Sequence, residues 1–263
     1  MVIKWPGGKK WIPLKHNSLF HTQYNTYLEP FMGSGAVFFG LEPESAFLSD
    51  INPKLINLFS ELKENPQRLY EETQVLISSH SSDQYYKIRD KFNTSEPTAA
   101  NFLYLNRTCF NGVYRENKKG DFNVPIGKRN SSFFPFSFEE FKVFSDALKN
   151  AQLSCEDCFS ALEKANEGDF IYIDPPYIKN ENNYESFRKY GKDIFDRESL
   201  EQLSSKLEEL SSKCKILISN FDLEDVKVLF NSNWNVKSVE QMSYISGTGK
   251  GRKAMKEVLI YNY

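Results

Sequence analysis

A short apolar run that stops at two consecutive prolines is the feature that most constrains how this chain can fold. Phe170-Ile171-Tyr172-Ile173 is followed directly by Asp174-Pro175-Pro176-Tyr177. An apolar run of this length, bounded by a turn signal, is typical of a strand buried on both faces of a parallel sheet. The prolines end the strand because each lacks the backbone N–H that a sheet ladder needs. The pattern therefore predicts a buried strand with a polar corner at its carboxyl end.

The rest of the chain alternates between strand-like and helix-like patterns, except in its second quarter. Strands are expected over residues 24–29, 45–49, 151–154, 169–173, 215–219, 234–239 and 257–261. Helices are expected near 36–41, 53–62, 138–149, 199–213 and 223–230. Between them, residues 67–77, 84–92 and 98–105 read as polar helices, and the Gly- and Asn-rich residues 111–129 as a hairpin or an ordered loop. The order predicts an α/β fold: a largely parallel sheet, with a helical module and a hairpin inserted after its second strand.

Composition sets outer limits on the class of protein. Of the 263 residues, 40% are hydrophobic and 15% aromatic, which suffices for a sizeable core. No apolar run approaches the roughly 20 residues that span a bilayer, and the first residues lack the apolar core of a signal peptide. We therefore expect a cytoplasmic protein with no membrane segment.

Cysteine and histidine usage argues against a metal site. The chain has four cysteines, and the Cys155-x-x-Cys158 pair invites a zinc or redox interpretation. A structural zinc site needs about four ligands, and the three histidines have no ligand spacing with this pair. We expect reduced structural thiols and no bound metal.

The charge is distributed unevenly although the net charge is only −2. Residues 1–16 carry four lysines and no acid, 106–130 carry six basic residues against two acids, and 247–256 carry four basic residues and no acid. Three basic islands on an otherwise acidic chain favour a localised contact with a polyanion. Solvated loops are the alternative for any one island.

A second motif, Glu29-Pro30-Phe31-Met32-Gly33-Ser34-Gly35, lies between a predicted strand and a helix. Glycines at such a turn let the backbone approach a ligand beyond the carboxyl ends of the strands. No Lys-Ser/Thr follows the glycines, which excludes a Walker phosphate loop, and Phe38 stands where a dinucleotide motif needs its third glycine. The next strand ends at Asp50, whose carboxylate suits a ribose diol. A structural glycine turn and a helix-leading acid are the alternatives.

The Asp174–Tyr177 corner is suited to holding an amino group of an aromatic base. A side-chain oxygen of Asp174 and the carbonyl of Pro175 can each accept one N–H, and Tyr177 can stack on the ring. Holding both N–H groups would aim the nitrogen lone pair at a methyl donor, and alignment would supply several kcal/mol of the catalysis. The reaction needs no strong base.

Taken together, these motifs resemble the DNA adenine methyltransferases of the Dam family, the amino-methyltransferase group in which the cofactor motif precedes the recognition domain. Lys4-Trp5-Pro6-Gly7-Gly8-Lys9, the Glu29–Gly35 turn, Ser49–Asn52, 218–220 and 253–261 all match in order. The resemblance implies a Rossmann-like S-adenosylmethionine-dependent methyltransferase fold. Its catalytic domain would comprise residues 1–56 and 137–263, and its target-recognition domain residues 57–136. The resemblance implies that S-adenosylmethionine is held by Trp5, Lys9, Glu29, Pro30, Phe31, Gly33, Gly35, Asp50, Asp157 and Asp174.

The hairpin also resembles that family, over Asn106–Asn117 and Phe122–Lys128. The family implies that Arg115 reads a guanine through O6 and N7, and that Phe110 and Asn111 intrude beside a flipped base. We expect a monomer acting on double-stranded DNA within a GATC-type palindrome. The expected DNA-binding residues are Lys4, Arg107, Phe110, Asn111, Val113, Arg115, Asn117, Pro125, Lys128 and Arg129.

Two departures and two alternatives remain at this point. Asp157-Cys158-Phe159 stands where the family has Asp-Phe, so either Cys158 or Phe159 would pack on the cofactor adenine. Lys128-Arg129 stands where the family often has a basic residue followed by an aromatic one. An N4-cytosine methyltransferase would present the same amine geometry but more often has Ser-Pro-Pro-Tyr. A non-catalytic DNA-binding relative is the other alternative, against which the intact motifs speak.

Overall fold

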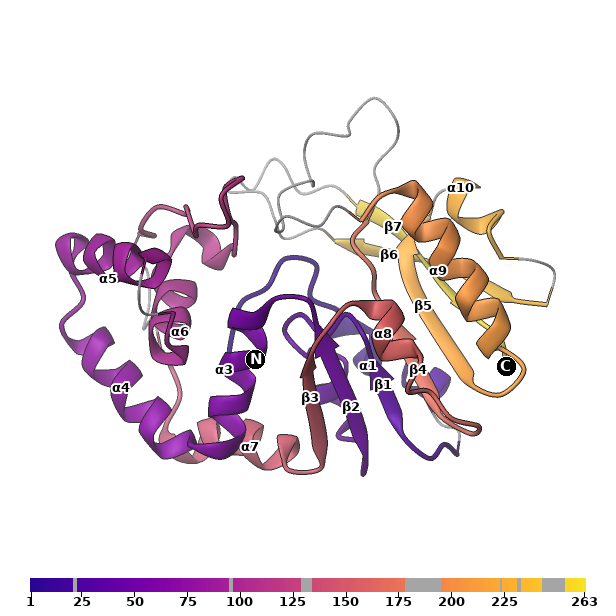
Figure 1. Ribbon diagram of the computed structural model, residues 1–263, viewed down its shortest axis with the longest axis horizontal. Coiled ribbons are helices and arrows are strands. Elements are labelled where there is room, and N and C mark those ends of the chain that lie inside the picture. Colours follow the sequence, from indigo (N-terminus) through magenta and orange to yellow (C-terminus); the bar gives the residue numbers. More distant parts are fainter. Residues whose placement is uncertain are drawn as a thin grey trace.

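A single mixed sheet organises the molecule (Figure 1). The computed structural model describes residues 1–20, 23–94, 97–128, 134–177, 195–222, 224–230, 233–242 and 254–263. Within them, seven strands pair in the order β3-β2-β1-β4-β5-β7-β6. β7 is antiparallel to both neighbours and every other pair is parallel, which confirms the expected α/β class. The strands are β1 (Tyr27–Glu29), β2 (Ala46–Asp50), β3 (Ala151–Cys155), β4 (Phe170–Ile173), β5 (Lys215–Phe221), β6 (Asn235–Met242) and β7 (Ala254–Tyr261).

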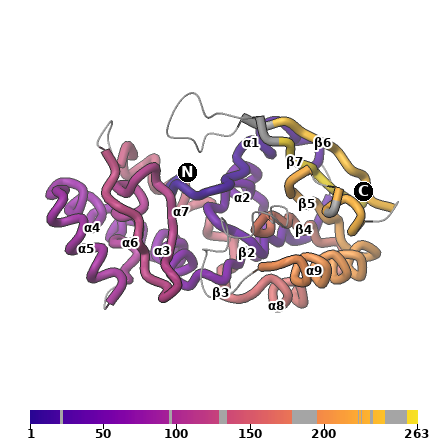
Figure 2. Tube along the Cα trace, turned by 90° about the horizontal axis from the view of Figure 1, so that it is seen from above, coloured from indigo at the N-terminus to yellow at the C-terminus, as the bar shows by residue number. Residues whose placement is uncertain are grey.

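Alternating side chains of the strands supply two separate apolar cores, one on each face of the sheet. In β4, Tyr172 joins one core, whereas Ile171 and Ile173 join the other. This is the period of two that a strand buried on both faces must show. Helices α1 (Trp11–Lys15), α2 (Phe38–Leu41) and α3 (Pro53–Glu64) line the first core. Helices α8 (Cys158–Leu162), α9 (Arg197–Leu210) and α10 (Glu224–Lys227) line the second, and Figure 2 shows α1 and α2 opposite α8 and α9.

A helical module extends from one end of the sheet, beyond β3, as both views show. It contains α4 (Pro66–Ser78), α5 (Ser82–Thr94) and α6 (Ala99–Thr108), and α7 (Phe138–Leu148) leads the chain back to β3. Every residue of α6 is buried, so this helix forms the centre of the module. The module follows the second strand in the chain, as the sequence predicted.

The segment after α6, called the hairpin here, has little regular strand pairing. In the part of the segment that the structure describes, two isolated antiparallel bridges, Cys109↔Ile126 and Glu116↔Phe122, connect its arms. Side chains replace much of the missing ladder: the amide of Asn93 accepts from the Phe122 N–H at 2.8 Å and donates to the Phe122 carbonyl at 3.0 Å. Of the two alternatives that the sequence left open, the structure has the ordered loop, with two bridges between its arms.

Other element boundaries shift for local reasons. β1 begins at Tyr27 instead of residue 24, because Asn25 and Thr26 bond to Gly168 and Asp169 outside the sheet. α10 is one turn long, whereas a helix was expected over residues 223–230. The short helices α1 and α8 were not predicted. Among the residues described, none of the helices combines the length and the apolar character that crossing a membrane requires.

The N-terminal segment lies between the sheet and the helical module, where both views place the first residue. The buried side chain of Asn106 forms two hydrogen bonds with the backbone of this segment. The Lys4 N–H donates to Asn106 Oδ1 at 2.9 Å, and Asn106 Nδ2 donates to the Lys4 carbonyl at 2.7 Å. The first basic segment is therefore joined directly to the end of α6.

Candidate active site and DNA-facing hairpin

The predicted motifs meet at one edge of the sheet, where the parallel strands have their carboxyl ends. β1 ends at Glu29, β2 at Asp50, and Asp174 follows β4. β1 and β4 are neighbours, and the strand order reverses direction between them. In open α/β sheets a crevice forms at such a switch point, and ligands bind there. The fold thus brings residues from far apart in the sequence into one candidate site.

The glycine turn after β1 owes its shape to two glycines. Gly33 and Gly35 have φ values of +49° and +65°, the left-handed region in which a side chain is strained. A Cβ at Gly35 would lie 2.9 Å from a ring carbon of Phe39, and one at Gly33 would lie 3.1 Å from the indole of Trp5. The turn therefore needs glycine both for its backbone and for its close neighbours.

Asp50 supports this turn from the next strand. Its Oδ2 accepts from the Gly33 N–H at 3.0 Å, and its Oδ1 accepts from the Asn52 N–H at 2.9 Å. Asn52 then caps α3, accepting from the N–H groups of Lys54 and Leu55, with Pro53 at the first helical position. Burial raises the pKa of Asp50, while the two backbone bonds act against that rise. Each oxygen keeps room for a further donor, since a carboxylate offers about four acceptor positions.

Glu29 lies beneath the turn and not on its surface. Its Oε2 accepts from the Tyr27 hydroxyl at 2.9 Å and from the Phe38 N–H at 3.2 Å. Burial is the main cause that raises the pKa of Glu29 to about 8, so the side chain is mostly protonated at neutral pH. Pro30 is buried, and Phe31 is half-buried with its ring edge-on to Phe195 at 5.7 Å.

Asp174 sits at the centre of a hydrogen-bonded cluster. The Ser219 hydroxyl donates to Asp174 Oδ1 at 2.8 Å, and the hydroxyls of Ser219 and Tyr172 are 2.7 Å apart. Burial raises the pKa of Asp174, whereas Lys9 and Ser219 lower it. The Asp174 side chain is still 21% exposed, so a ligand can reach it.

Lys9 brings a positive charge to the same corner. The residue is only 4% exposed, and its Nζ donates to the Gly7 carbonyl at 2.9 Å. Nζ also lies 3.4 Å from Asp174 Oδ1, 3.5 Å from Glu257 Oε2 and 4.4 Å from the centre of the Tyr177 ring. The single ammonium is therefore shared by two carboxylates and an aromatic face.

Tyr177 is held at both its edge and its hydroxyl. The hydroxyl donates to Glu257 Oε2 at 3.0 Å, and the ring meets Phe221 edge-on with centroids 4.5 Å apart. Pro175 is buried and Pro176 exposed. All four residues of the predicted corner thus lie at the carboxyl edge, close to the glycine turn.

Asp157 caps a helix, which the sequence analysis did not foresee. Its Oδ1 accepts from the N–H groups of Phe159 and Ser160, and its Oδ2 accepts from the Ser160 hydroxyl. These hydrogen bonds, led by that of Ser160, lower the pKa of Asp157. Cys158 is buried in the second core and Phe159 is half-buried against it. Both remain candidates for packing on a cofactor.

Trp5 connects the glycine turn with the helical module. Its indole stacks on Tyr114 at 5.1 Å and lies next to Phe102 at 6.5 Å. The indole also packs close to Gly33, where an added Cβ would lie 3.1 Å from it. Trp5 therefore bridges the predicted cofactor turn and the base of the hairpin.

The hairpin presents an exposed aromatic residue at a strained point of the backbone. Phe110 is 48% exposed, unusual for a side chain of this size, and Asn111 has a left-handed φ of +55°. Gly112 follows with a φ of +64°, and a Cβ there would collide with the Lys4 side chain. Val113 is half-buried, and Pro125 is exposed with its carbonyl accepting from the Phe110 N–H at 2.9 Å.

Arg115 points outward and is oriented by one hydrogen bond. Its Nε donates to Asn123 Oδ1 at 2.8 Å. Among the residues that the structure describes, no partner is recorded for its two terminal nitrogens. Asn117 holds the turn of the loop: its Oδ1 accepts from the N–H groups of Lys119 and Asp121.

The remaining predicted DNA-binding residues differ in exposure. Lys4 and Lys128 are exposed, whereas Arg107 is only 9% exposed, with its guanidinium 5.4 Å from the ring centre of Phe136. Burial lowers the pKa of Arg107. Arg129 lies outside the described residues.

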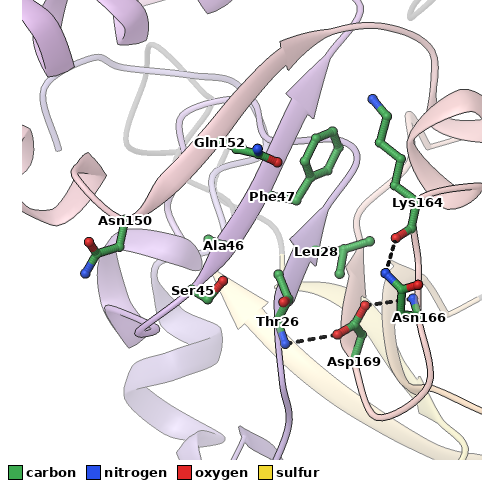
Figure 3. A pocket seen from close by; sticks show the side chains of 10 residues that line it. All are labelled: Thr26, Leu28, Ser45, Ala46, Phe47, Asn150, Gln152, Lys164, Asn166 and Asp169. Carbon is green, nitrogen blue, oxygen red and sulfur yellow. Dashed lines mark hydrogen bonds between the residues drawn. The ribbon is translucent and has the colours of Figure 1, made fainter.

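A separate hollow of about 520 Å³ opens at the opposite edge of the sheet (Figure 3). Thr26, Ser45, Asn150 and Asp169, which lie just before strands, line it. The Asp169 carboxylate accepts from the N–H groups of Thr26 and Asn166 at 3.0 and 2.8 Å, so its role there is to join loops. This hollow lies away from the glycine turn and from Asp174, and we assign no chemistry to it.

The sequence analysis missed several residues of the site, notably Ser219, Glu257 and Asn106. Ser219 follows Ile218, the partner of Ile173 in the β4–β5 register, so strand pairing could have placed it beside Asp174. A lone acid directly before the apolar run 258–260 was a signal for Glu257. Within the described ranges, no group of three or more His, Cys, Asp or Glu side chains is placed to hold a metal ion.

Comparison with known proteins agrees with this geometry. A "DNA adenine methylase" of Serratia marcescens is 37% identical over 84% of this chain and 83% of its own length. One from Haemophilus influenzae is 34% identical over 98% and 91%, and a type II methyltransferase of Methanocaldococcus jannaschii is 34% identical over 99% and 98%. The model of the family described as "D12 class N6 adenine-specific DNA methyltransferase" matches residues 5–245. The chain thus belongs to this family of DNA adenine-N6 methyltransferases, and the Rossmann-like sheet with its inserted module is the fold of such an enzyme.

Proposed function

We propose that this DNA methyltransferase takes its methyl group from S-adenosylmethionine and transfers it to an adenine flipped into the Asp174-Pro175-Pro176-Tyr177 corner, within GATC sequences. The observation that carries the proposal is the meeting of Asp174, Tyr177 and the glycine turn at one switch point of the sheet. An enzyme that modifies a base must remove it from the stack, and this corner offers acceptors and an aromatic ring.

The residues at the turn fit the proposed donor in charge and in shape. Two glycines leave the backbone open to a ligand, and Asp50 supports the turn with acceptor capacity left for a ribose. The corner holds Asp174 and Glu257 against one lysine, so its surplus of negative charge suits a cationic sulfonium. When bound, S-adenosylmethionine supplies an electrophilic methyl group.

We assign a contact with S-adenosylmethionine to the residues around the turn and a supporting role to the buried ones. Trp5, Phe31, Gly33, Gly35, Asp50 and Asp157 would line the site. Glu29 and Pro30 are buried under the turn and would act by shaping it. Lys9 would orient Asp174.

Within the corner, Asp174 and Pro175 would accept the two N–H groups of the adenine amine. Ser219 holds Asp174 Oδ1 from one side, which restricts the carboxylate to one orientation. Because the amine is held by two acceptors, its lone pair is directed away from them, toward the turn. The proton of the product leaves after transfer, and no strong base is required.

The hairpin would read the sequence around this adenine. Arg115, whose guanidinium is oriented by Asn123, would contact a guanine, and exposed Phe110 would fill the gap left by the flipped base. Asn111, Val113, Asn117 and Pro125 would adjoin the bases, and Lys4, Lys128 and Arg129 the phosphates. Arg107 has little exposed surface, and we expect the smallest contribution from it.

We propose the division into a catalytic domain of residues 1–56 and 137–263 and a recognition domain of residues 57–136. α3 runs through the first junction, and Lys54 on it pairs with Glu116 of the hairpin at 2.9 Å. The two parts would therefore move as one unit at this junction.

The methylome of a host without adenine methylation tests the substrate and site. The host would express this chain, and single-molecule sequencing would record modified bases genome-wide. We expect N6-methyladenine in GATC, confirmed by protection from a restriction enzyme blocked by that mark. N6-methyladenine confined to another sequence would refute the GATC assignment and leave the enzyme class intact. An otherwise identical host expressing Asp174→Ala serves as control.

A further inference from the structure

Glu257 is a buried acid that the proposed function above uses only for its charge, without giving it a role in positioning the base pocket. It heads the apolar run of β7 and is 7% exposed. In the sheet it pairs with Phe221 at the end of β5, which puts it at the same edge as Asp174. A carboxylate in such a position is costly unless other groups compensate it. Its contacts therefore indicate what it does.

The Glu257 carboxylate contacts Tyr177 of the proposed base pocket and Lys9 beside it. One oxygen, Oε2, accepts the Tyr177 hydroxyl at 3.0 Å and lies 3.5 Å from Lys9 Nζ. Lys9 in turn is 3.4 Å from Asp174 Oδ1. Glu257 is therefore linked to the Asp174 corner in two ways: through the side chain of Tyr177, and through the ammonium of Lys9.

We propose that Glu257 is a positioning residue for methyl transfer, holding the Tyr177 ring beside Asp174 and drawing part of the Lys9 charge away from the Asp174 carboxylate. The proposal rests on the assignment of Asp174–Tyr177 as the base pocket. Glu257 would not touch the base or the donor.

The first effect is orientation of the ring. A tyrosine side chain has two torsions, and a hydrogen bond at its far end restrains both. The Glu257 bond holds the hydroxyl, while Phe221 meets the ring edge and Lys9 lies over one face. A base entering the pocket would therefore meet a ring already in place, and less of the binding energy would be lost in ordering it.

The second effect is on charge. Lys9 lies almost equally far from the two carboxylates, so neither has the ammonium to itself. Without Glu257, Lys9 would pair with Asp174 alone and occupy the acceptor that the amine needs. The other charged or titratable groups facing Asp174 are Glu29, on β1, and Tyr172 and Tyr177, on β4 and beyond it. Loss of the negative charge at Glu257 should lower the pKa of Asp174, because like charges disfavour ionisation of each other.

Two substitutions separate the two effects. Glu257→Gln keeps an acceptor for Tyr177 but removes the charge, whereas Glu257→Ala removes both. Glu240→Gln is the matched control, because Glu240 is an exposed acid on the neighbouring strand β6, opposite Lys256, and has no assigned part in the site. Thermal unfolding of each variant establishes that it is folded before turnover is compared.

We expect Glu257→Ala to lower kcat by about 100-fold, the order of loss that a misplaced reacting group causes, with the Kd for cognate duplex changed less than about threefold. Glu257→Gln should lose less than about tenfold, since the ring stays anchored. In Glu257→Gln the acidic limb of the kcat/KM profile should move to lower pH. A duplex with 2-aminopurine at the target position reports base flipping by its fluorescence. The fluorescence of the enzyme–DNA complex should differ from that of the wild type in Glu257→Ala but not in Glu257→Gln.

The double variant Tyr177→Phe/Glu257→Ala tests whether the ring mediates the effect. The loss from Glu257→Ala should be smaller in the Tyr177→Phe background, because the hydroxyl contact is already absent. Wild-type kcat in both Glu257 variants would overturn the proposal, as would equal losses in both with an unshifted pH profile. Turnover by Asp174→Ala at the wild-type rate would instead show that the pocket itself is misassigned.

Discussion

The carboxyl edge of the sheet and the hairpin represent two ways of presenting polar side chains. At the edge, Asp174 is surrounded by buried groups, with Lys9, Ser219 and Glu257 all below a tenth exposed. On the hairpin, Arg115 is exposed and one bond from Asn123 orients it. The first arrangement holds a reacting group inside the fold by several contacts, and the second orients an exposed side chain by a single hydrogen bond.

The difference follows from what each region has to contact. A reacting amine must meet acceptors of fixed position, and buried hydrogen bonds are strong because the surroundings have a low dielectric constant. A DNA groove is wide and wet, so outward side chains on a loop held by Asn117 and Asn93 suffice. We therefore expect substitutions at the edge to change rates, and substitutions on the hairpin to change the choice of sequence.

The largest expected effect is at Asp174. Asp174→Ala should reduce kcat by about 10²–10³-fold, the loss typical of removing one transition-state contact, while the Kd for duplex DNA stays within about threefold. Single-turnover methyl transfer together with a binding titration measures both quantities. Asp169→Asn is the matched control, because Asp169 is a buried acid at the other end of the same strand. Equal losses of rate and affinity in Asp174→Ala would contradict the contrast between the two regions.

Sequence reasoning located the corner well because its signals are local. An apolar run ending in Asp-Pro-Pro-Tyr gives both a strand and its end, and parallel strands bring such ends to one edge. Glu257 could not be placed in this way: it lies 80 residues from Tyr177, and its pairing depends on the register of an antiparallel strand. No periodicity in the sequence specifies that register.

The sequence predicted where the hairpin lies in the chain but not the contacts that hold it. Its glycines and asparagines signalled turns, but Phe122, which forms one of its two bridges, is also held by Asn93 of α5, a residue distant in sequence. Likewise, Arg107 was expected on the surface with the other basic residues, yet it lies in the last turn of a helix whose every residue is buried. Charge alone does not distinguish a side chain that faces DNA from one that packs over an aromatic ring.

A smaller effect is expected at Arg115, and on a different quantity. Arg115→Ala should leave kcat on the preferred site within about threefold, but reduce discrimination against a substituted guanine by about 1–3 kcal/mol, the value of one bidentate base contact. Competition between duplexes that differ only at that base pair provides the measurement. Asn123→Ala, which removes only the bond that orients the guanidinium, should give a smaller loss of the same kind. If discrimination stayed intact while turnover fell, the hairpin would belong to the catalytic region instead.

The last expected effect concerns stability instead of activity and comes from Glu29, beneath the glycine turn. Its pKa is about 8 in the fold against 4.5 in the unfolded chain, so the folded state retains a proton that the unfolded state releases between these values. The free energy of unfolding should therefore fall as pH rises through this window, by on the order of 1 kcal/mol per pH unit. Glu29→Gln stays neutral and should lose this slope, becoming more stable than the wild type at pH 8 relative to pH 5. Urea unfolding at several pH values measures it, and parallel curves for the two proteins would mean that the carboxyl under the turn is ionised.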